Sequence, residues 1–308
     1  MSGLSDLHRH LDGSLRPATL AELSAAAGLV VPHDLVFTPG MGLGAALSRF
    51  EFTLSILQTP AAVRRIASEM CEDAATEGVT TLEIRFAPQL HMRAGATIGE
   101  IIDAAVDGAA GRAGIILCGL YGEPPDVLMR LVDAAEHRLG VVGIDLAGGA
   151  DSGDAFALAD YAAPFARAAA LGLGRTVHAG EGRPADEIRV AVETLGAQRI
   201  GHGTSLLEDP AVLALVLERG IVIEACPTSN VHTGALARIE DHPLPRWLDL
   251  GVRAAVCADN TLLSATDARV ELGRAMRIPG LDNTLLSAPA ELAGAFPRRK
   301  PVAGAATT

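Results

Sequence analysis

Long apolar runs, aromatic residues and basic patches are all scarce in this 308-residue sequence. Aromatic residues make up 3% of it and hydrophobic residues 49%, so aliphatic side chains must fill the core. No run of about 18 apolar residues marks a membrane-spanning helix, and the N-terminus lacks the basic and apolar regions of a signal peptide. We therefore expect a cytoplasmic protein that does not bind a membrane.

The net charge indicates which kinds of partner the protein can bind, and the cysteines indicate the compartment. The formal net charge is −12, and basic residues cluster only in the short Arg298–Lys300 segment. Proteins that grip nucleic acid usually carry a basic stripe, so we expect a small-molecule substrate and no nucleic acid. The four cysteines include no CxxC pair and are predicted to be buried thiols in a reducing compartment. Composition leaves the oligomeric state open.

Eight short apolar segments alternate with helical patterns along the chain. Ile221, Val222 and Ile223 are apolar at consecutive positions, which is typical of strands buried on both faces of a parallel sheet. The predicted strands are Asp6–His10, Thr80–Ala87, Gly114–Leu120, Gly140–Ala147, Arg175–Ala179, Arg199–His202, Ile221–Cys226 and Val252–Ala258. The alternation predicts an α/β fold, and eight units predict one (β/α)₈ TIM barrel. Length alone would also accommodate two average domains.

The predicted barrel domain spans residues 1–296, and residues 297–308 are expected to form a disordered tail. A long insertion follows the first strand and contains two periodic helical segments, Leu43–Leu57 and Thr59–Glu77. The pattern fits helices packed on the barrel and fits equally a lid over its mouth. The sequence therefore leaves the role of the segment 41–58 open.

Two histidines end the first predicted strand. Side chains two residues apart on a strand point to the same face, so His8 and His10 can enter one barrel mouth while Arg9 points away. Two imidazoles at this spacing can bind one metal ion. An HxH pair also arises by chance, so its weight depends on what the other strands carry.

Three further strands end in polar residues of the types that metal-dependent hydrolases use. His178 and Glu181 follow the fifth strand, His202 ends the sixth and Asp259 follows the eighth. Taken singly, each has an ordinary explanation, such as a helix cap or a turn residue. Taken together, they lie at the carboxyl ends of strands, where barrel enzymes place their catalytic groups.

Three histidines and one aspartate make a suitable shell for Zn²⁺, with water at a remaining position. The candidate ligands are His8, His10, His178 and Asp259. The same shell would also accept Fe²⁺, Co²⁺ or Mn²⁺. Glu181 and His202 remain beside it as an acid and a base, so the residues predict an enzyme site with one divalent metal ion.

The chain resembles the adenosine deaminase family of the amidohydrolase superfamily. The matching segments occur in the family's order across residues 4–265, and they are HRHLDG at His8–Gly13, LEIRFAP at Leu82–Pro88, IDLAG at Ile144–Gly148, HAGE at His178–Glu181, GHG at Gly201–Gly203, CPTSN at Cys226–Asn230 and ADN at Ala258–Asn260. The resemblance implies a (β/α)₈ barrel and the four metal ligands named above. It also implies Glu181 as the proton donor to purine N1, and His202 as the group that orients and deprotonates the attacking water. Asp259 could accept a hydrogen bond from that water as well as bind the metal.

The resemblance further implies contacts with the substrate. His10 and Asp12 would lie near the ribose 5′-hydroxyl, and the main chain of Gly148 near N3 of the base. Leu47 and Phe50, in the long insertion, resemble the apolar residues that cover the nucleoside.

Four positions depart from the family pattern. Asn260 replaces a second aspartate that is thought to bind purine N7; an amide donates at any ordinary pH, so it could keep that contact. Gly149 and Ala150 follow IDLAG, where the family usually has Asp-Glu, and Tyr121 stands where arginine is more common. These changes concern the rim of the pocket more than the metal.

The resulting prediction is metal-dependent hydrolytic deamination of a 6-aminopurine nucleoside, with adenosine or 2′-deoxyadenosine giving inosine or 2′-deoxyinosine plus ammonia. Alternative substrates are adenine, a 5′-modified adenosine or aminodeoxyfutalosine, because rim residues set specificity. Hydrolysis of another C–N bond, or a catalytically silent metal-binding barrel, are further alternatives. A deaminase of the cytidine type is excluded, because its H-x-E and P-C-x-x-C motifs do not occur.

Overall fold

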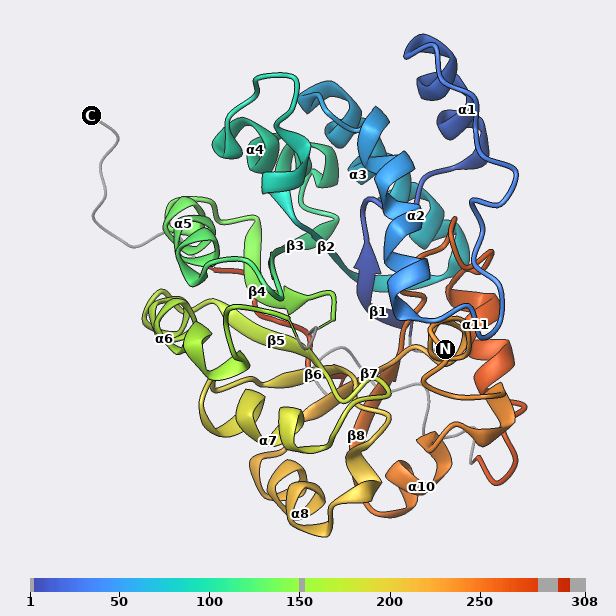
Figure 1. Cartoon of the computed structure of the whole chain (residues 1–308), viewed down its shortest axis with the longest axis vertical. Coiled ribbons are helices and arrows are strands. Elements are labelled where there is room, and N and C mark those ends of the chain that lie inside the picture. The colour runs from blue at the N-terminus through green and yellow to red at the C-terminus, as the bar shows by residue number, and fades with distance from the viewer. Residues whose placement is uncertain (1–2, 150–152, 282–292, 300–308) are drawn as a thin grey trace.

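Eight parallel strands follow one another around a barrel in the order of the chain (Figure 1). The computed structural model describes residues 3–149, 153–281 and 293–299. The strands are β1 (Leu4–His10), β2 (Val79–Phe86), β3 (Ala113–Leu120), β4 (Val141–Ala147), β5 (Gly174–Ala179), β6 (Arg199–His202), β7 (Val222–Ala225) and β8 (Arg253–Val256). All eight predicted strands are confirmed, and no predicted end differs from the observed end by more than two residues.

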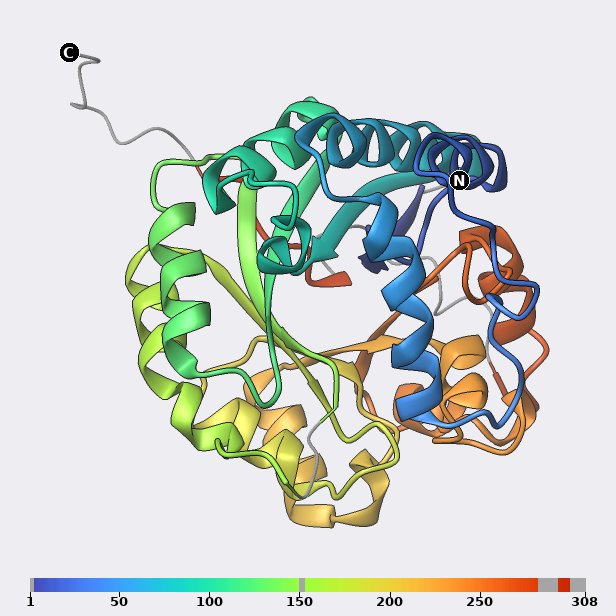
Figure 2. The ribbon, with the colours of Figure 1, turned by 45° about the horizontal axis from the view of Figure 1, so that its top comes forward.

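Helices connect the strands and form a ring around them (Figure 2). The α-helices are α1 (Pro17–Ala26), α2 (Leu43–Ile56), α3 (Pro60–Glu77), α4 (Ile98–Ala109), α5 (Pro125–Ala135), α6 (Ala162–Ala170), α7 (Asp186–Glu193), α8 (Pro210–Arg219), α9 (Pro227–His232), α10 (Leu244–Asp249) and α11 (Ala268–Ala275). Short 3₁₀ turns lie in the connections: η1 (Pro88–His91), η2 (Leu158–Tyr161), η3 (Leu206–Glu208) and η4 (Ile239–Asp241). Local signals set the helix ends: for α8, Asp209 accepts a hydrogen bond from the Ala211 N–H, and Gly220 follows with φ 62°.

Main-chain hydrogen bonds beside Asp259 close the barrel between β8 and β1. The Asp259 N–H donates to the His8 carbonyl at 2.8 Å, and the His10 N–H donates to the Asp259 carbonyl at 2.8 Å. Arg9 points outward, as the alternation predicts, and pairs with Glu77 of α3 at 2.5 Å. Three residues with potential ligand side chains therefore take part in the closure itself.

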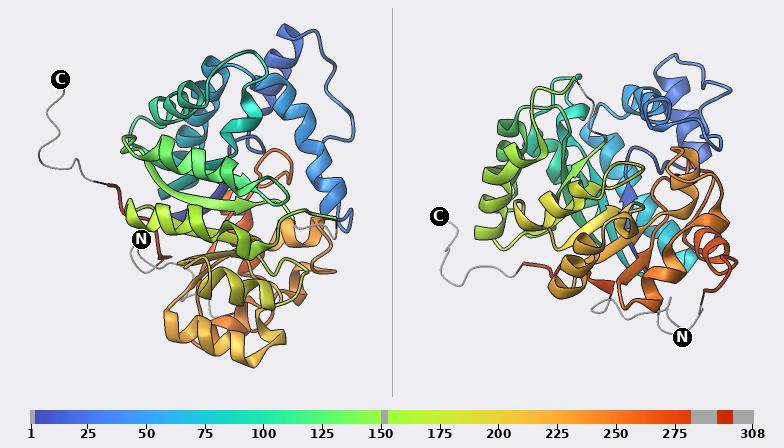
Figure 3. Two further views of the ribbon diagram at one scale, coloured as in Figure 1. Left: turned by 60° about the vertical axis from the view of Figure 1, so that its left-hand side comes forward. Right: turned by 60° about the horizontal axis from the view of Figure 1, so that its bottom comes forward.

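The last described segment covers the amino-terminal end of the barrel. The Phe296 ring lies over the Arg199 guanidinium at 3.7 Å, and the Phe296 N–H donates to Glu83 at 2.6 Å. Gly174 makes room for this ring, because a Cβ there would lie 2.2 Å from it. Figure 3, left, shows the red segment at the end of the barrel opposite α2, so it covers the base and leaves the mouth open.

The long insertion after β1 supplies both a packing helix and a cover. α3 packs on the outside of the barrel against β2 and α4. α2 lies across the mouth (Figure 2), and its side chains Leu47 and Phe50 line the cavity beneath it. The insertion therefore contains both of the predicted alternatives: α3 is a helix packed on the barrel, and α2 covers its mouth.

The structure can be compared with the predictions for the C-terminal tail, the cysteines and membrane-spanning helices. Residues 300–308 of the predicted tail lie outside the described residues, whereas Arg299 donates to the main-chain carbonyls of Ala135, Glu136, Arg138 and Val141. The four cysteines are free and buried, as predicted. Among the described helices, none has both the length and the apolar character that a membrane span requires.

Candidate active site

Three histidine side chains from β1 and β5 converge at the carboxyl end of the barrel. The Nε2 atom of His10 lies 3.3 Å from the Nε2 atoms of both His8 and His178. His8 and His178 are buried, and 14% of the His10 side chain is exposed, toward the mouth. The structure therefore brings together the three histidines that the sequence singled out.

Buried carboxylates fix the ring orientation of two of these histidines. Nδ1 of His8 lies 2.7 Å from the carboxylate of Glu224, and Nδ1 of His178 lies 3.0 Å from that of Asp145. A carboxylate only accepts hydrogen bonds, so each Nδ1 carries the proton and each Nε2 keeps a lone pair. Carboxylate–histidine pairs of this kind orient metal-binding imidazoles.

One guanidinium holds the two carboxylates together. Arg85 donates to Asp145 and to Glu224, at 2.7 Å in both cases. Burial alone would raise the pKa of Glu224, but Arg85 and Arg199 lower it to about 2. Burial would also raise the pKa of Asp145, but the neighbouring His178 N–H and the Arg85 guanidinium hold it below its usual range. Both carboxylates therefore stay ionised.

Asp259 completes the group from the end of β8. Its Oδ1 atom lies 3.5 Å from Nε2 of His10 and 3.7 Å from Nε2 of His8. The side-chain amide of Asn260 donates to the same Oδ1 at 2.6 Å. Burial raises the pKa of the Asp259 carboxyl, and a cation beside it would offset that rise by favouring the ionised form.

This set of side chains fits a divalent cation. Three imidazole lone pairs and a carboxylate face one another, and none of these atoms can donate a hydrogen bond to the others. Burial lowers the pKa of His8 and of His10 well below the usual value, so both rings are neutral, as metal ligands must be. A second group of possible ligand atoms within the described ranges, from His8, Cys226 and Asp259, shares two residues with the first.

Glu181 and His202 lie beside the histidines and share one partner. The amide nitrogen of Asn230 lies 3.0 Å from Nδ1 of His202 and 3.3 Å from Oε1 of Glu181. The Thr233 hydroxyl donates to the same Oε1 at 2.8 Å. Burial raises the pKa of Glu181 and lowers that of His202 to about 3. A carboxyl that tends to stay protonated and a neutral imidazole therefore lie side by side, as acid–base chemistry requires.

Two of these residues have left-handed backbone conformations, with φ 67° at His202 and φ 59° at Asp259. Such conformations are uncommon outside glycine and cost about 1–3 kcal/mol where the surroundings enforce them. Gly201 permits the close packing at this point, because a Cβ there would lie 3.0 Å from the His8 ring. The glycine before His202, a weak signal in the sequence, thus has a steric reason.

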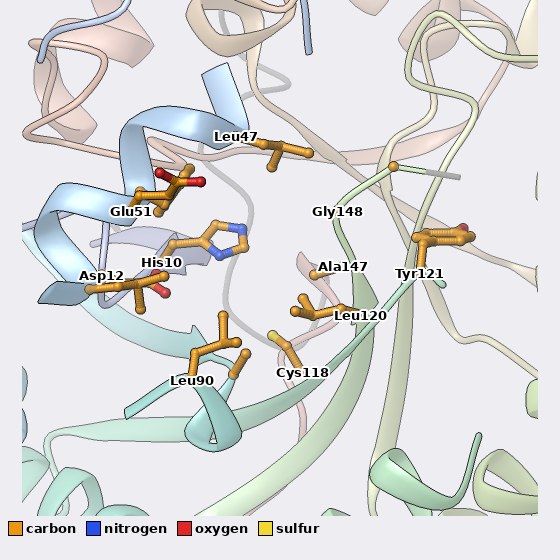
Figure 4. Close-up of a pocket in the computed structure, with 14 residues that line it drawn as sticks. His10, Asp12, Leu47, Glu51, Leu90, Cys118, Leu120, Tyr121, Ala147 and Gly148 are labelled. Carbon is orange, nitrogen blue, oxygen red and sulfur yellow. The ribbon is translucent and has the colours of Figure 1, made fainter. Parts of the chain in front are cut away.

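A cavity of about 270 Å³ opens beside the histidines, below α2 (Figure 4). It is lined by five of the predicted substrate contacts: His10, Asp12, Leu47, Phe50 and Gly148. A smaller cavity of about 50 Å³ shares His10, Leu47, Phe50 and Gly148 with it and reaches His178, Glu181, His202, Asp259 and Asn260. Because the two cavities share these four residues, the predicted substrate contacts adjoin the candidate catalytic groups.

Sequence reasoning missed the residues that hold the candidate ligands in place. No role was predicted for Asp145, Glu224, Arg85 or Asn230. A signal was available, because Glu224 follows the apolar run that begins at Ile221, in a segment expected to be buried on both faces. A charge in such a place must have a buried partner. The sequence does not say which partner.

Replacing Glu224 with Gln should weaken metal binding. The neutral amide of glutamine would not fix the proton on Nδ1 of His8 as the carboxylate does. The substitution would also remove the negative charge that pairs with Arg85. We expect zinc affinity to fall about 10- to 100-fold, as measured by competition with a chromogenic chelator. Glu83→Gln is the matched control, since Glu83 pairs with Arg199 at 2.6 Å but forms no ion pair with a histidine among the described residues. Equal zinc affinity in wild type and Glu224→Gln would contradict this role.

The fold is shared with solved deaminases and amidohydrolases. The adenine deaminase of Arthrobacter aurescens superposes with a TM-score of 0.84 at 24% identity, over 93% of this chain and 92% of that one. An amidohydrolase from Burkholderia ambifaria, solved with bound zinc, gives a TM-score of 0.80 at 23% identity, over 91% of this chain and 81% of that one. At these identities the likeness establishes the TIM-barrel fold.

Sequence comparisons are more specific. The adenosine deaminase of Erwinia tasmaniensis is 35% identical over 298 residues, which cover 90% of this chain and 88% of that protein. The adenosine deaminase of Enterococcus faecalis is 34% identical over 278 residues, covering 85% and 81% respectively. A family model described as adenosine deaminase matches residues 4–293. The resemblance drawn from the motif segments is thus confirmed, and the chain belongs to the adenosine deaminase family.

Proposed function

We propose that this protein is a metal-dependent hydrolase that converts adenosine or 2′-deoxyadenosine to inosine or 2′-deoxyinosine and ammonia. The observation that carries the proposal is a buried acid and a neutral histidine, joined by Asn230, beside the convergent Nε2 atoms of three histidines. Relatives named adenosine deaminase, at 34% and 35% identity over most of the chain, favour adenosine over other 6-aminopurines.

Glu181 is assigned as the proton donor. The aromatic C6 of adenine is a poor electrophile, and protonation of N1 makes it a better one. Because burial raises the pKa of Glu181, this carboxyl can hold a proton that an ordinary glutamate would lose. Thr233 and Asn230 both contact Oε1, which leaves Oε2 to carry the proton toward the base.

His202 is assigned as the group that takes a proton from the attacking water. Burial favours the neutral form of its ring, so one ring nitrogen keeps a lone pair that can accept a proton. Addition of the water oxygen to C6 gives a tetrahedral intermediate. The proton returned to the amino group lets ammonia leave, and the 6-oxopurine remains; one water is consumed for each ammonia released.

We propose Zn²⁺ as the resident ion, held by His8, His10, His178 and Asp259. Three imidazole nitrogens and one carboxylate oxygen suit zinc, and Fe²⁺, Co²⁺ and Mn²⁺ would also be accepted. When bound, a divalent ion polarises water so that it loses a proton near neutral pH. The chain's own contribution is the set of four buried ligand atoms and the carboxylates that orient two of the rings.

The cavity suits an uncharged nucleoside. Asp12 and Glu51 are the acidic side chains that line it, and no lysine or arginine in the described part of the chain does so. A 5′-phosphate would meet carboxylates there instead of cations. We assign Asp12 to the ribose 5′-hydroxyl, the Gly148 main chain to N3, and Leu47 with Phe50 to the cover of the nucleoside.

Asn260 can serve the metal ligand and the substrate together. One amide hydrogen is donated to Asp259 Oδ1 at 2.6 Å. The second hydrogen is available to purine N7, and an amide donates at any ordinary pH. The replacement of the usual aspartate is therefore compatible with purine binding.

The direct test is to incubate the zinc-loaded protein with adenosine and follow the absorbance change as the 6-amino group becomes 6-oxo. 2′-Deoxyadenosine, adenine and a 5′-thio-substituted adenosine run in parallel. We expect adenosine and 2′-deoxyadenosine to be converted, with activity abolished by a chelator and restored by Zn²⁺. If only another purine were converted, the assignment of adenosine as the substrate would be wrong. If no purine were converted while the metal is bound, the assignment of a deamination reaction would be wrong.

Glu181→Gln should lower kcat about 10²- to 10⁴-fold while leaving the zinc content unchanged, because the amide keeps the shape and loses the proton. Asp259→Ala should lose both zinc and turnover.

An acid acts when protonated, so wild-type kcat/KM should decline as pH rises through the pKa of Glu181, which burial places above its ordinary value. Equal activity in wild type and Glu181→Gln would rule out Glu181 as the proton donor. The same fall of kcat/KM at high pH in both proteins would also rule it out.

A further inference from the structure

The main-chain carbonyl of His178 receives two side-chain hydrogen bonds from outside its strand. Tyr121, directly after β3, donates its hydroxyl at 2.6 Å. Arg183, two residues beyond Glu181, donates from Nη2 at 3.3 Å. Two side chains therefore hold the backbone of a residue whose ring belongs to the candidate metal site.

These two side chains also contact each other and the turn that follows β5. The Arg183 guanidinium lies over the Tyr121 ring, 4.8 Å from its centre. Glu187 pairs with Nε of Arg183 at 3.0 Å and accepts a hydrogen bond from the Gly180 N–H at 3.2 Å. Side chains therefore hold this turn by hydrogen bonds at the His178 carbonyl and at the Gly180 N–H.

Gly149 lies beside this network. A Cβ there would lie 2.5 Å from Cδ2 of Leu43 and 3.5 Å from Nη1 of Arg183. A carboxylate at that position would compete with the His178 carbonyl for the guanidinium, so glycine leaves Arg183 to the turn after β5.

Tyr121 also connects the network to the substrate cavity. Its ring lines the cavity, near Leu120 and Gly148 (Figure 4). Burial raises the pKa of Tyr121, so the hydroxyl stays protonated and remains a donor. The same side chain forms part of the cavity wall and holds the backbone of a ligand residue.

We propose that Tyr121 and Arg183 are positioning residues that hold the His178 main chain, and through it the His178 ring, in the orientation that binds the metal. Loss of either hydrogen bond would let Nε2 of His178 move relative to the other two histidines. It would also loosen the turn that carries Glu181. The catalytic consequence rests on the proposed function, whereas the metal-binding consequence does not.

The test compares Tyr121→Phe, Arg183→Gln and the double variant with wild type. Tyr161→Phe is the control for the loop that carries Tyr121, because the Tyr161 hydroxyl donates to the main-chain carbonyls of Glu123 at 2.6 Å and Leu120 at 3.2 Å but not to that of His178. The first measurement is the rate of zinc release into excess chelator. The second is the visible absorption spectrum of the cobalt-substituted protein, which reports ligand geometry. The third is kcat and KM with adenosine.

We expect Tyr121→Phe and Arg183→Gln each to release zinc about 10-fold faster than wild type, as for other partners of metal ligands. Both should alter the cobalt spectrum and lower kcat more than they raise KM. Tyr161→Phe should match wild type in zinc release and in spectrum. Unchanged zinc release and spectrum in Tyr121→Phe and Arg183→Gln, or equal changes in Tyr161→Phe, would overturn the proposal. Because these two readouts need no substrate, they decide it even if the protein does not deaminate adenosine.

Discussion

The site depends most on the guanidinium of Arg85, because it pairs with both carboxylates that orient the candidate metal ligands His8 and His178. It reaches Asp145 on β4 and Glu224 on β7 at 2.7 Å each. Without a cation between them, two buried anions would have raised pKa values, and a protonated carboxyl no longer fixes the proton on a histidine Nδ1. A buried charge is costly unless it is paired, so this network must form as a unit.

The barrel supplies the geometry that lets such a network exist. Strand alternation turns His8 and His10 to one face, and the main-chain bonds that close the barrel place Asp259 between them. At the opposite end, Phe296 covers Arg199, whose guanidinium is buried within the barrel. α2 then provides a cover over the mouth. The charged interior is thus enclosed from two sides, and chemistry is confined to the end where the strands terminate.

The sequence predicts whatever depends on local spacing. The eight strands and the residues at their carboxyl ends follow from apolar runs and from the parallel topology, which brings such ends to one rim. It does not predict which distant polar groups meet. Glu224 lies 216 positions from His8, Asn230 lies 49 from Glu181 and Tyr121 lies 57 from His178. No periodicity encodes these pairs. For the same reason, the insertion after β1 could not be divided into a packing helix and a cover without the three-dimensional arrangement.

Buried carboxylates fix the protons of His8 and His178 on Nδ1, so that both Nε2 atoms, together with that of His10, are free to bind one metal ion. The most direct measurement is anomalous diffraction at the zinc edge from crystals of the zinc-loaded protein. We expect one zinc ion within about 2.0–2.2 Å of the three Nε2 atoms and of the Asp259 carboxylate, with both Nδ1 atoms still bonded to Glu224 and Asp145. Zinc bound through Nδ1, or held by Cys226 without His10 and His178, would contradict it.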